Sequence, residues 1–233
     1  FDRHLYEKGA LVLHMLRHEL GDDLFWRALR HYVRKHQFQN VETADFKIAI
    51  EEATGRHLDA FFDQWVYGAG FPEIEASWSW DEPTSSVRLR LRQTQERDAG
   101  RPPFTFPLDI ELGAARGSER RRIQVERDEQ TVHLPATARP LWIRLDPGRW
   151  ILCRWRFEAS RSELLAQLAH DKDPFGVADA AEGLVRFVHD SEVVGALAAA
   201  LPRPRFFVAK RAIATSLGRL GGDVARRSLL AAL

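Results

Sequence analysis

The length, composition and charge of the chain are those of an ordinary globular protein. Its 233 residues suffice for two or three small domains, and 45% hydrophobic with 29% charged residues is typical of soluble proteins. A formal net charge of +1 excludes a global field that favours nucleic acid or a membrane surface. No apolar run approaches the length of a membrane span, and the single cysteine, Cys153, permits no internal disulfide. We expect a soluble protein without a nucleic-acid or membrane partner; the composition fits a cytoplasmic and a periplasmic or secreted location equally.

Residues 1 to about 70 are predicted to be helical. The first helix runs from about Arg3 to Leu20 and ends at Gly21, and its apolar residues recur every three to four positions, which indicates one buried face. Gly9 lies on that face. Because glycine inside a helix costs about 1 kcal/mol relative to alanine, we expect Gly9 to let a second element approach closely. Three more helices are predicted, starting near Asp22 or Asp23, at an N-cap Thr43 with an end at Gly55, and near Leu58.

The hydrophobic pattern changes to period two after residue 73. In the clearest case Val87, Leu89 and Leu91 alternate with arginines, as in a strand with one solvent-exposed face. Similar short runs follow, separated by glycine and proline, and such a series predicts an antiparallel β-sandwich. The predicted strands are 74–80, 87–92, 106–112, 121–125, 131–134, 141–145 and 150–157, with Cys153 as a small core residue in the last of them.

From Ser160 onward the period is helical again. Ser160 or Ser162 is a suitable N-cap for the first of these helices, and the later ones are rich in alanine and leucine with short turns between them. Short paired helices of this kind stack as an α-solenoid, in which each pair buries the face of its neighbour. The later helices are predicted at about 174–189, 191–201, 204–219 and 223–232.

Clusters of tryptophan and arginine in the strand region have two interpretations. Trp78 and Trp80 share one face of a strand and could form a binding platform, but filling of the core is the stronger hypothesis. A basic face is formed by Arg88, Arg90, Arg92, Arg120, Arg121 and Arg122. Because carboxylates are interspersed and no aromatic ladder accompanies these arginines, a nucleic-acid interface is the weaker hypothesis.

The start of the first helix carries a recognisable motif. It reads Tyr6-x-Lys8-Gly9-Ala10, then Leu13-His14-Met15-Leu16-Arg17 and Leu20-Gly21-Asp22, with later matches at Tyr32, Thr43-x-Asp45-Phe46, Phe61-Phe62-x-Gln64-Trp65 and Gly70-Phe71-Pro72. This stretch, residues 1 to about 72, resembles the zinc aminopeptidase family typified by aminopeptidase N. In that family the tyrosine that matches Tyr6 donates a hydrogen bond to the oxyanion of the tetrahedral intermediate. The resemblance therefore implies that Tyr6 is catalytic.

The resemblance also implies a multi-domain α and β protein. Residues 1–72 correspond to the C-terminal helical part of a thermolysin-like metallopeptidase catalytic domain. Residues 73–158 correspond to an antiparallel β-sandwich, and residues 159–233 to a truncated, HEAT-like helical repeat domain. In the family these domains follow one another in this order, which agrees with the change of hydrophobic period along the chain.

The zinc site of the family is absent from this sequence. That site is an HExxH helix and a glutamate on a following helix, whereas the single His-Glu step here, His18-Glu19, has Asp22 in place of the second histidine. His14 and His18 lie one helical turn apart and could chelate a metal weakly, but no third ligand is evident, and a polar helix flank is the stronger hypothesis. We expect no metal site in this chain. The zinc ligands are expected to precede Phe1 in a longer protein.

The leading hypothesis is therefore the C-terminal portion of a zinc aminopeptidase that hydrolyses peptide bonds at N-termini. Its partners would be a peptide substrate and the N-terminal remainder of the same polypeptide, and the isolated chain would be inactive. An alternative is a non-catalytic protein-binding scaffold that shares the peptidase architecture. A third is a free-standing interaction module of sandwich and solenoid. The coding sequence upstream of Phe1 distinguishes the three.

Overall fold

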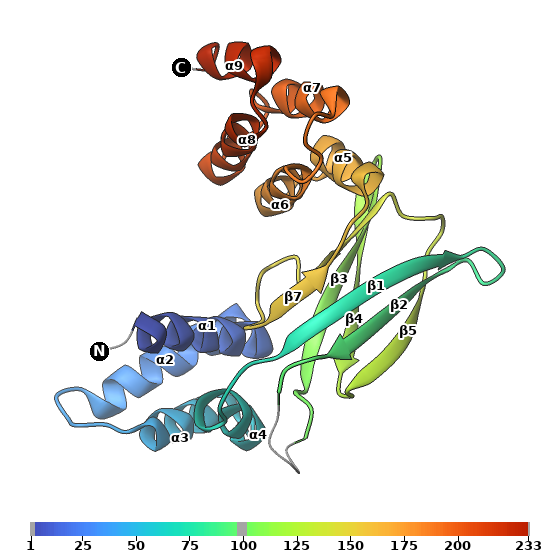
Figure 1. Ribbon diagram of the computed structural model, residues 1–233. Coiled ribbons are helices and arrows are strands. Elements are labelled where there is room, and N and C mark those ends of the chain that lie inside the picture. Colours follow the sequence, from blue (N-terminus) through green and yellow to red (C-terminus); the bar gives the residue numbers. More distant parts are fainter. Residues whose placement is uncertain (1–2, 97–101, 233) are drawn as a thin grey trace. The chain divides into compact units, whose positions relative to one another are not determined.

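The computed structural model describes residues 3–96 and 102–232 and is a mixed α and β structure (Figure 1). The chain divides into two compact units. The first unit comprises Phe1–Ile74, Gln93–Phe104 and Gly148–Trp155, and the second comprises Glu75–Arg92, Thr105–Pro147 and Arg156–Leu233.

The first unit is built on the predicted helices. They are α1 (Arg3–Leu20), α2 (Asp22–His36), α3 (Thr43–Thr54) and α4 (Asp59–Phe62), and α4 continues as a π-helical turn, η1 (Asp63–Tyr67). Gly55 ends α3 in the left-handed conformation, at φ 69°, which glycine adopts without steric cost. The N-cap of α3 is Glu42 instead of the predicted Thr43, because the backbone N–H of Glu42 donates to the Asp45 carboxylate at 2.8 Å.

One apolar cluster holds these helices together. Each helix contributes the side chains that its 3.6-residue period places on one face. The buried members of the cluster are Leu16, Leu20, Phe25, Ala28, Ile50, Leu58 and Phe62. The first unit thus has a core of its own.

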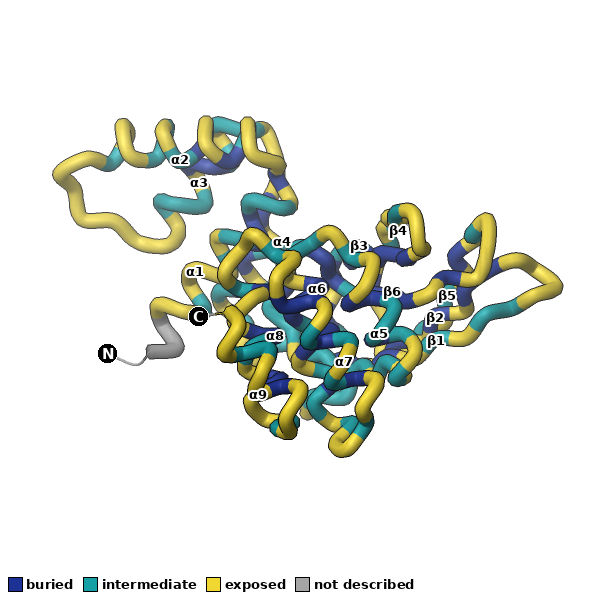
Figure 2. Tube along the Cα trace, turned by 90° about the horizontal axis from the view of Figure 1, so that it is seen from above, coloured by how far each residue is buried: buried dark blue, intermediate teal, exposed yellow. Residues whose placement is uncertain are grey.

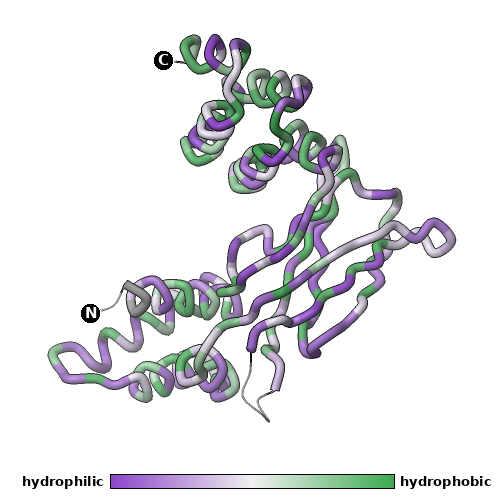
Figure 3. Tube along the Cα trace, viewed as in Figure 1, coloured by the Kyte–Doolittle hydropathy of each residue, from purple (hydrophilic) through white to green (hydrophobic). Residues whose placement is uncertain are grey.

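The seven predicted strands are all present. They are β1 (Glu73–Asp81), β2 (Ser86–Gln93), β3 (Phe106–Ala114), β4 (Gly117–Val125), β5 (Glu129–Pro135), β6 (Trp142–Leu145) and β7 (Arg154–Phe157). They form a four-stranded sheet in the order β5-β2-β1-β7 and a three-stranded sheet in the order β4-β3-β6. The pairs β2–β5, β3–β4 and β3–β6 are antiparallel. Hydrophobic and hydrophilic residues alternate along the strands, as Figure 3 shows.

Five helices follow the strands. They are α5 (Arg161–His170), α6 (Pro174–Leu184), α7 (Ser191–Ala200), α8 (Phe207–Leu220) and α9 (Gly222–Leu230). Ser160, Asp173 and Asp190 cap α5, α6 and α7 by accepting hydrogen bonds from backbone N–H groups of the first turn. Alanine, valine and leucine side chains from all five helices share one apolar cluster, and their buried positions are dark blue in Figure 2. No helix within the described residues combines the length and apolar composition that crossing a membrane requires.

Two predicted elements are shorter than expected. The strand predicted at 150–157 begins only at Arg154, because the segment before it packs on α1: Trp150 stacks on His14, and the backbone N–H of Leu152 donates to Sδ of Met15. Cys153 therefore precedes the strand and is half-buried instead of belonging to the core. The helix predicted at 174–189 ends at Leu184, where the backbone tightens: the N–H of Phe187 donates to the carbonyl of Leu184, three residues back.

Candidate functional site

Tyr6 lies in the first turns of α1 and projects into solvent. Its exposed fraction is 73%. No hydrogen bond to its hydroxyl is present among the residues that the structure describes, so the phenol is available as a donor to a ligand. The predicted catalytic tyrosine is thus accessible.

The helix that carries Tyr6 is tied to η1. Lys8, two residues after Tyr6, donates through Nζ to the carbonyl oxygen of Gly68 at 3.5 Å. Gly68 has no room for a side chain, since a Cβ there would lie 2.5 Å from the carbonyl oxygen of Gln64. The motif Tyr6-x-Lys8 therefore places the side chain of Tyr6 in solvent and that of Lys8 at the C-terminal end of η1.

An apolar cavity of about 860 Å³ opens between the helices of the first unit. Its walls come from α1, α2, α3, α4 and η1. The lining includes Gly9, Val12, Leu13, Leu16, Leu29, Tyr32, Val33, Val41, Phe46, Phe61, Phe62, Trp65 and Val66. Gly9 was expected to allow a close approach, but a Cβ built at Gly9 meets no atom within 4 Å. That expectation is wrong for the described residues, and Gly9 instead forms part of the cavity wall.

His14 and His18 pack against an indole. Their rings stack on Trp150 with centroid distances of 4.1 Å and 4.6 Å and interplanar angles of 15°. In residues 3–96 and 102–232, no three side chains of His, Cys, Asp or Glu form a group that could hold a metal ion. Trp150 therefore covers the side of α1 that carries the two histidines. The spacing of the histidines in the sequence does not predict this contact.

The arginines of the predicted basic face are largely paired with carboxylates. Arg90 lies 2.5 Å from Glu129, Arg121 lies 2.6 Å from Glu119, and Arg122 lies 2.6 Å from Asp109. Arg92 pairs with Glu75. Most of these pairs join neighbouring strands, and they reduce the positive field that an anionic polymer would meet.

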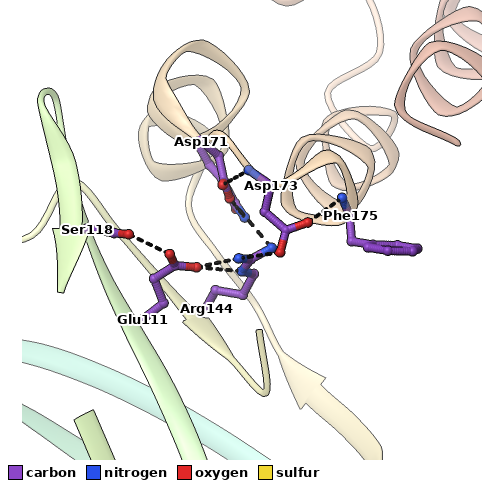
Figure 4. Close-up of polar contacts among 7 residues, drawn as sticks. Glu111, Ser118, Arg144, Asp171, Asp173 and Phe175 are labelled. Atoms are coloured by element: carbon purple, nitrogen blue, oxygen red, sulfur yellow. Dashed lines mark hydrogen bonds and ion pairs between the residues drawn. The ribbon is translucent and has the colours of Figure 1, made fainter. Parts of the chain in front are cut away.

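A buried ionic cluster in the second unit was not predicted from the sequence. Glu111 of β3, Arg144 of β6, and Asp171 and Asp173 between α5 and α6 converge there (Figure 4). One signal was available: Arg144 interrupts an otherwise apolar strand, Leu141-Trp142-Ile143-Arg144-Leu145. A buried arginine requires carboxylate partners, but only the fold shows which ones.

Comparisons with known proteins concern the same N-terminal stretch and the fold. Residues 1–65 match the family described as Peptidase family M1 domain. Aminopeptidase N of Lactococcus lactis subsp. lactis is 39% identical over 72 residues, which are 31% of this chain and 8% of that protein. Glutamyl aminopeptidase of Bos taurus is 26% identical over 186 residues, which are 78% of this chain and 19% of that protein. This chain therefore spans a fifth or less of the length of these two relatives.

A solved structure resembles the whole chain. It is the crystal structure of Legionella pneumophila aminopeptidase A in complex with aspartic acid, with a TM-score of 0.74 and 17% sequence identity. The match covers 100% of this chain and 29% of the other. At this level of identity the likeness shows a shared fold, which includes both the strands and the helices that follow them.

Proposed function

Since residues 1–65 of this chain belong to peptidase family M1, we propose that the chain is part of a zinc-dependent aminopeptidase that hydrolyses peptide bonds at N-termini. The observation that carries this proposal is the position of Tyr6. It lies within the matched residues, at the start of α1, with 73% of its surface exposed. Its hydroxyl is free to donate to the oxyanion that develops on the scissile carbonyl oxygen, and such a donor contributes roughly 3–4 kcal/mol in a preorganised site.

The described residues do not fit a zinc site. They hold no group of three ligand side chains, and His14 and His18 stack on Trp150. In this proposal the zinc ligands belong to a part of the polypeptide outside this sequence, and this chain contributes the hydrogen bond of Tyr6 and a scaffold.

The proposal extends to the architecture of the complete protein. The apolar cavity of the first unit, lined by residues such as Val12, Leu13 and Val33, would be covered by the remainder of the catalytic domain. The two sheets would form the sandwich of residues 73–158, and α5–α9 would begin a HEAT-like domain at about residue 159. The length of the relatives supports this, since the match covers only 8% and 19% of two of them.

The test is Tyr6→Phe in the complete polypeptide that contains this chain. The substitution removes one exposed hydroxyl, so the melting temperature should not change. Because the hydrogen bond is strongest in the transition state, kcat should fall by about a hundredfold or more while KM changes little. Steady-state kinetics on an aminoacyl chromogenic substrate, with zinc content measured in parallel, give both values.

Matched controls separate this role from packing. Tyr67→Phe removes a hydroxyl from another exposed tyrosine of the same unit, 59% exposed, and His14→Ala removes one of the rings on Trp150. Each should change kcat by less than about threefold, because neither is assigned to the chemistry. A Tyr6→Phe enzyme with full kcat contradicts the catalytic role. A complete polypeptide that carries no zinc and cleaves no peptide favours the scaffold alternative.

A further inference from the structure

One arginine and three carboxylates meet in the second unit where α5 and α6 adjoin strands β3 and β6 (Figure 4). The Nε of Arg144 donates to Oε2 of Glu111 at 2.9 Å, and its Nη2 lies 2.9 Å from Oδ2 of Asp173. The other oxygen of Glu111 accepts from the hydroxyl of Ser118 at 2.5 Å. The guanidinium thus connects the three-stranded sheet to the connection between the two helices.

Three of the four side chains are buried, Asp173 is 23% exposed, and the charges of the cluster do not balance. The side chains of Glu111 and Arg144 are 7% exposed and that of Asp171 is 3% exposed. With all three carboxylates ionised, one guanidinium leaves two negative charges in excess. Nη1 of Arg144 is buried without a hydrogen-bond partner among the described residues, and Oδ2 of Asp171 lies 3.8 Å from it, beyond hydrogen-bond distance. Asp171 therefore loses its hydration without gaining a direct hydrogen-bonded ion pair.

Asp171 is held in this position from several sides. Its Oδ1 accepts from the backbone N–H of Asp173 at 2.9 Å, and its Oδ2 accepts from Nε2 of Gln167 at 3.2 Å. Gly176 of α6 closes the site, since a Cβ there would lie 1.9 Å from Oδ2 of Asp171 and 2.5 Å from Nη1 of Arg144. The carboxyl group therefore lies tightly against the first turn of α6.

The groups that face Asp171 act on its charge in opposite directions. Burial raises the pKa of Asp171 above its ordinary value, and the nearby negative charge of Glu111 raises it further. Arg144 and the hydrogen bonds from Asp173 and Gln167 lower the same pKa, but the effect of burial is larger. The folded protein therefore binds a proton at Asp171 more tightly than the unfolded chain does.

We propose that Asp171 makes the contact between α5–α6 and the β3–β6 sheet sensitive to protons. A neutral carboxyl group donates from Oδ2 to the amide oxygen of Gln167, whose side-chain amide turns over to accept. Loss of the proton places an uncompensated charge in the cluster and weakens the contact. Because the pKa of Asp171 is raised in the folded state, its contribution to stability is greatest below that pKa and is lost as pH rises through it.

Hydrogen exchange in the complete polypeptide tests this proposal. We expect the backbone amides of α5 and α6, corrected for intrinsic exchange, to lose protection as pH rises from the unfolded pKa of aspartate, about 3.9, to about 7.5, by a factor of ten for each unit by which the pKa is raised. Asp171→Asn keeps the shape of the side chain and stays neutral, so its protection should not fall. Asp223→Asn, which neutralises an exposed carboxylate in α9 (78% exposed), should behave as the unaltered protein.

A second variant removes a hydrogen bond to the carboxyl group of Asp171. Gln167→Met removes a hydrogen bond that favours the ionised carboxylate while it keeps a side chain of similar length, so the pKa of Asp171 should rise further and the loss of protection with pH should become larger. Protection that is independent of pH in the unaltered protein overturns the proposal, whether or not the variants fold. A pH dependence that Asp171→Asn leaves intact also overturns it.

Discussion

Two histidines of α1 show how one residue elsewhere in the chain decides the role of a motif. His14 and His18 are spaced as chelating histidines on a helix are, but both rings lie nearly parallel to the indole of Trp150, at 15°. Met15, between them, accepts through Sδ from the backbone N–H of Leu152 at 3.5 Å. Aromatic stacking of this kind contributes about 0.5–1.5 kcal/mol beyond the buried area. The pair thus attaches the segment around Trp150 to α1.

Asp190 combines a helix cap with an ion pair. Its carboxylate accepts from Nε of Arg161 at 2.5 Å and from the backbone N–H groups of Glu192 and Val193, at 3.0 Å and 3.1 Å. The hydrogen bond from Arg161 is the largest cause that lowers the pKa of Asp190 to about 2. Since the folded pKa lies below the unfolded value of about 3.9, the stabilisation is complete above the unfolded value and is lost as pH falls through about 2.

We therefore predict that Asp190→Asn lowers the melting temperature at pH 7. Asparagine still caps α7, so the change reports the ion pair, and the difference from the unaltered protein should shrink as pH falls from about 4 toward 2. Asp190→Ala removes the cap as well and should lower the melting temperature further at every pH. Equal melting temperatures of Asp190→Asn and the unaltered protein at pH 7 would show that the ion pair contributes nothing.

At the scale of single elements, we expect replacement of glycine by alanine to change stability in opposite directions in α6 and α7. Gly176 in the first turn of α6 has no room for a Cβ, whereas a Cβ at Gly195, in the middle of α7, meets no atom within 4 Å. Alanine favours a helix over glycine by about 1 kcal/mol where nothing opposes it. The packing around each position therefore decides the sign of the same substitution.

We predict that Gly195→Ala stabilises the protein by about 0.5–1 kcal/mol, through the helix propensity alone. Gly176→Ala should destabilise it, because the new methyl group collides with the carboxylate of Asp171 and the guanidinium of Arg144. Denaturant unfolding of the two variants measures both signs under one condition. Stabilisation by Gly176→Ala would contradict this prediction and would mean that the side chains of Asp171 and Arg144 move aside at little cost in free energy.

At the scale of the whole molecule, the described residues include the tyrosine proposed to be catalytic but no set of metal ligands. We therefore expect the isolated chain to be inactive. The described residues hold no group of three ligand side chains, and the relatives are several times longer than the match. We predict that the isolated 233-residue chain binds no zinc stoichiometrically and cleaves no aminoacyl chromogenic substrate. Atomic absorption and an activity assay check this prediction; one zinc per chain, or turnover that a chelator abolishes, contradicts it.

Local chemistry determined the elements of this protein. The 3.6-residue period and the glycine stops gave α1 with its observed bounds and the end of α3, because helix faces and terminators are properties of neighbouring residues. Short alternating or apolar runs between glycine and proline located all seven strands for the same reason, although β7 begins later than the sequence predicts. The motif around Tyr6 indicated the likeness to aminopeptidases, and residues 1–65 match the Peptidase family M1 domain.

Contacts between residues distant in sequence required the tertiary structure. The stacking of Trp150 on His14 and His18 spans more than a hundred positions, and the open space at Gly9 depends on where four other segments lie. The burial of Arg144 among carboxylates from β3 and the α5–α6 connection is likewise a consequence of packing. Periodicity shows which face of an element is apolar. Which element packs against that face, and which charged groups surround a buried side chain, is decided only when the elements pack together.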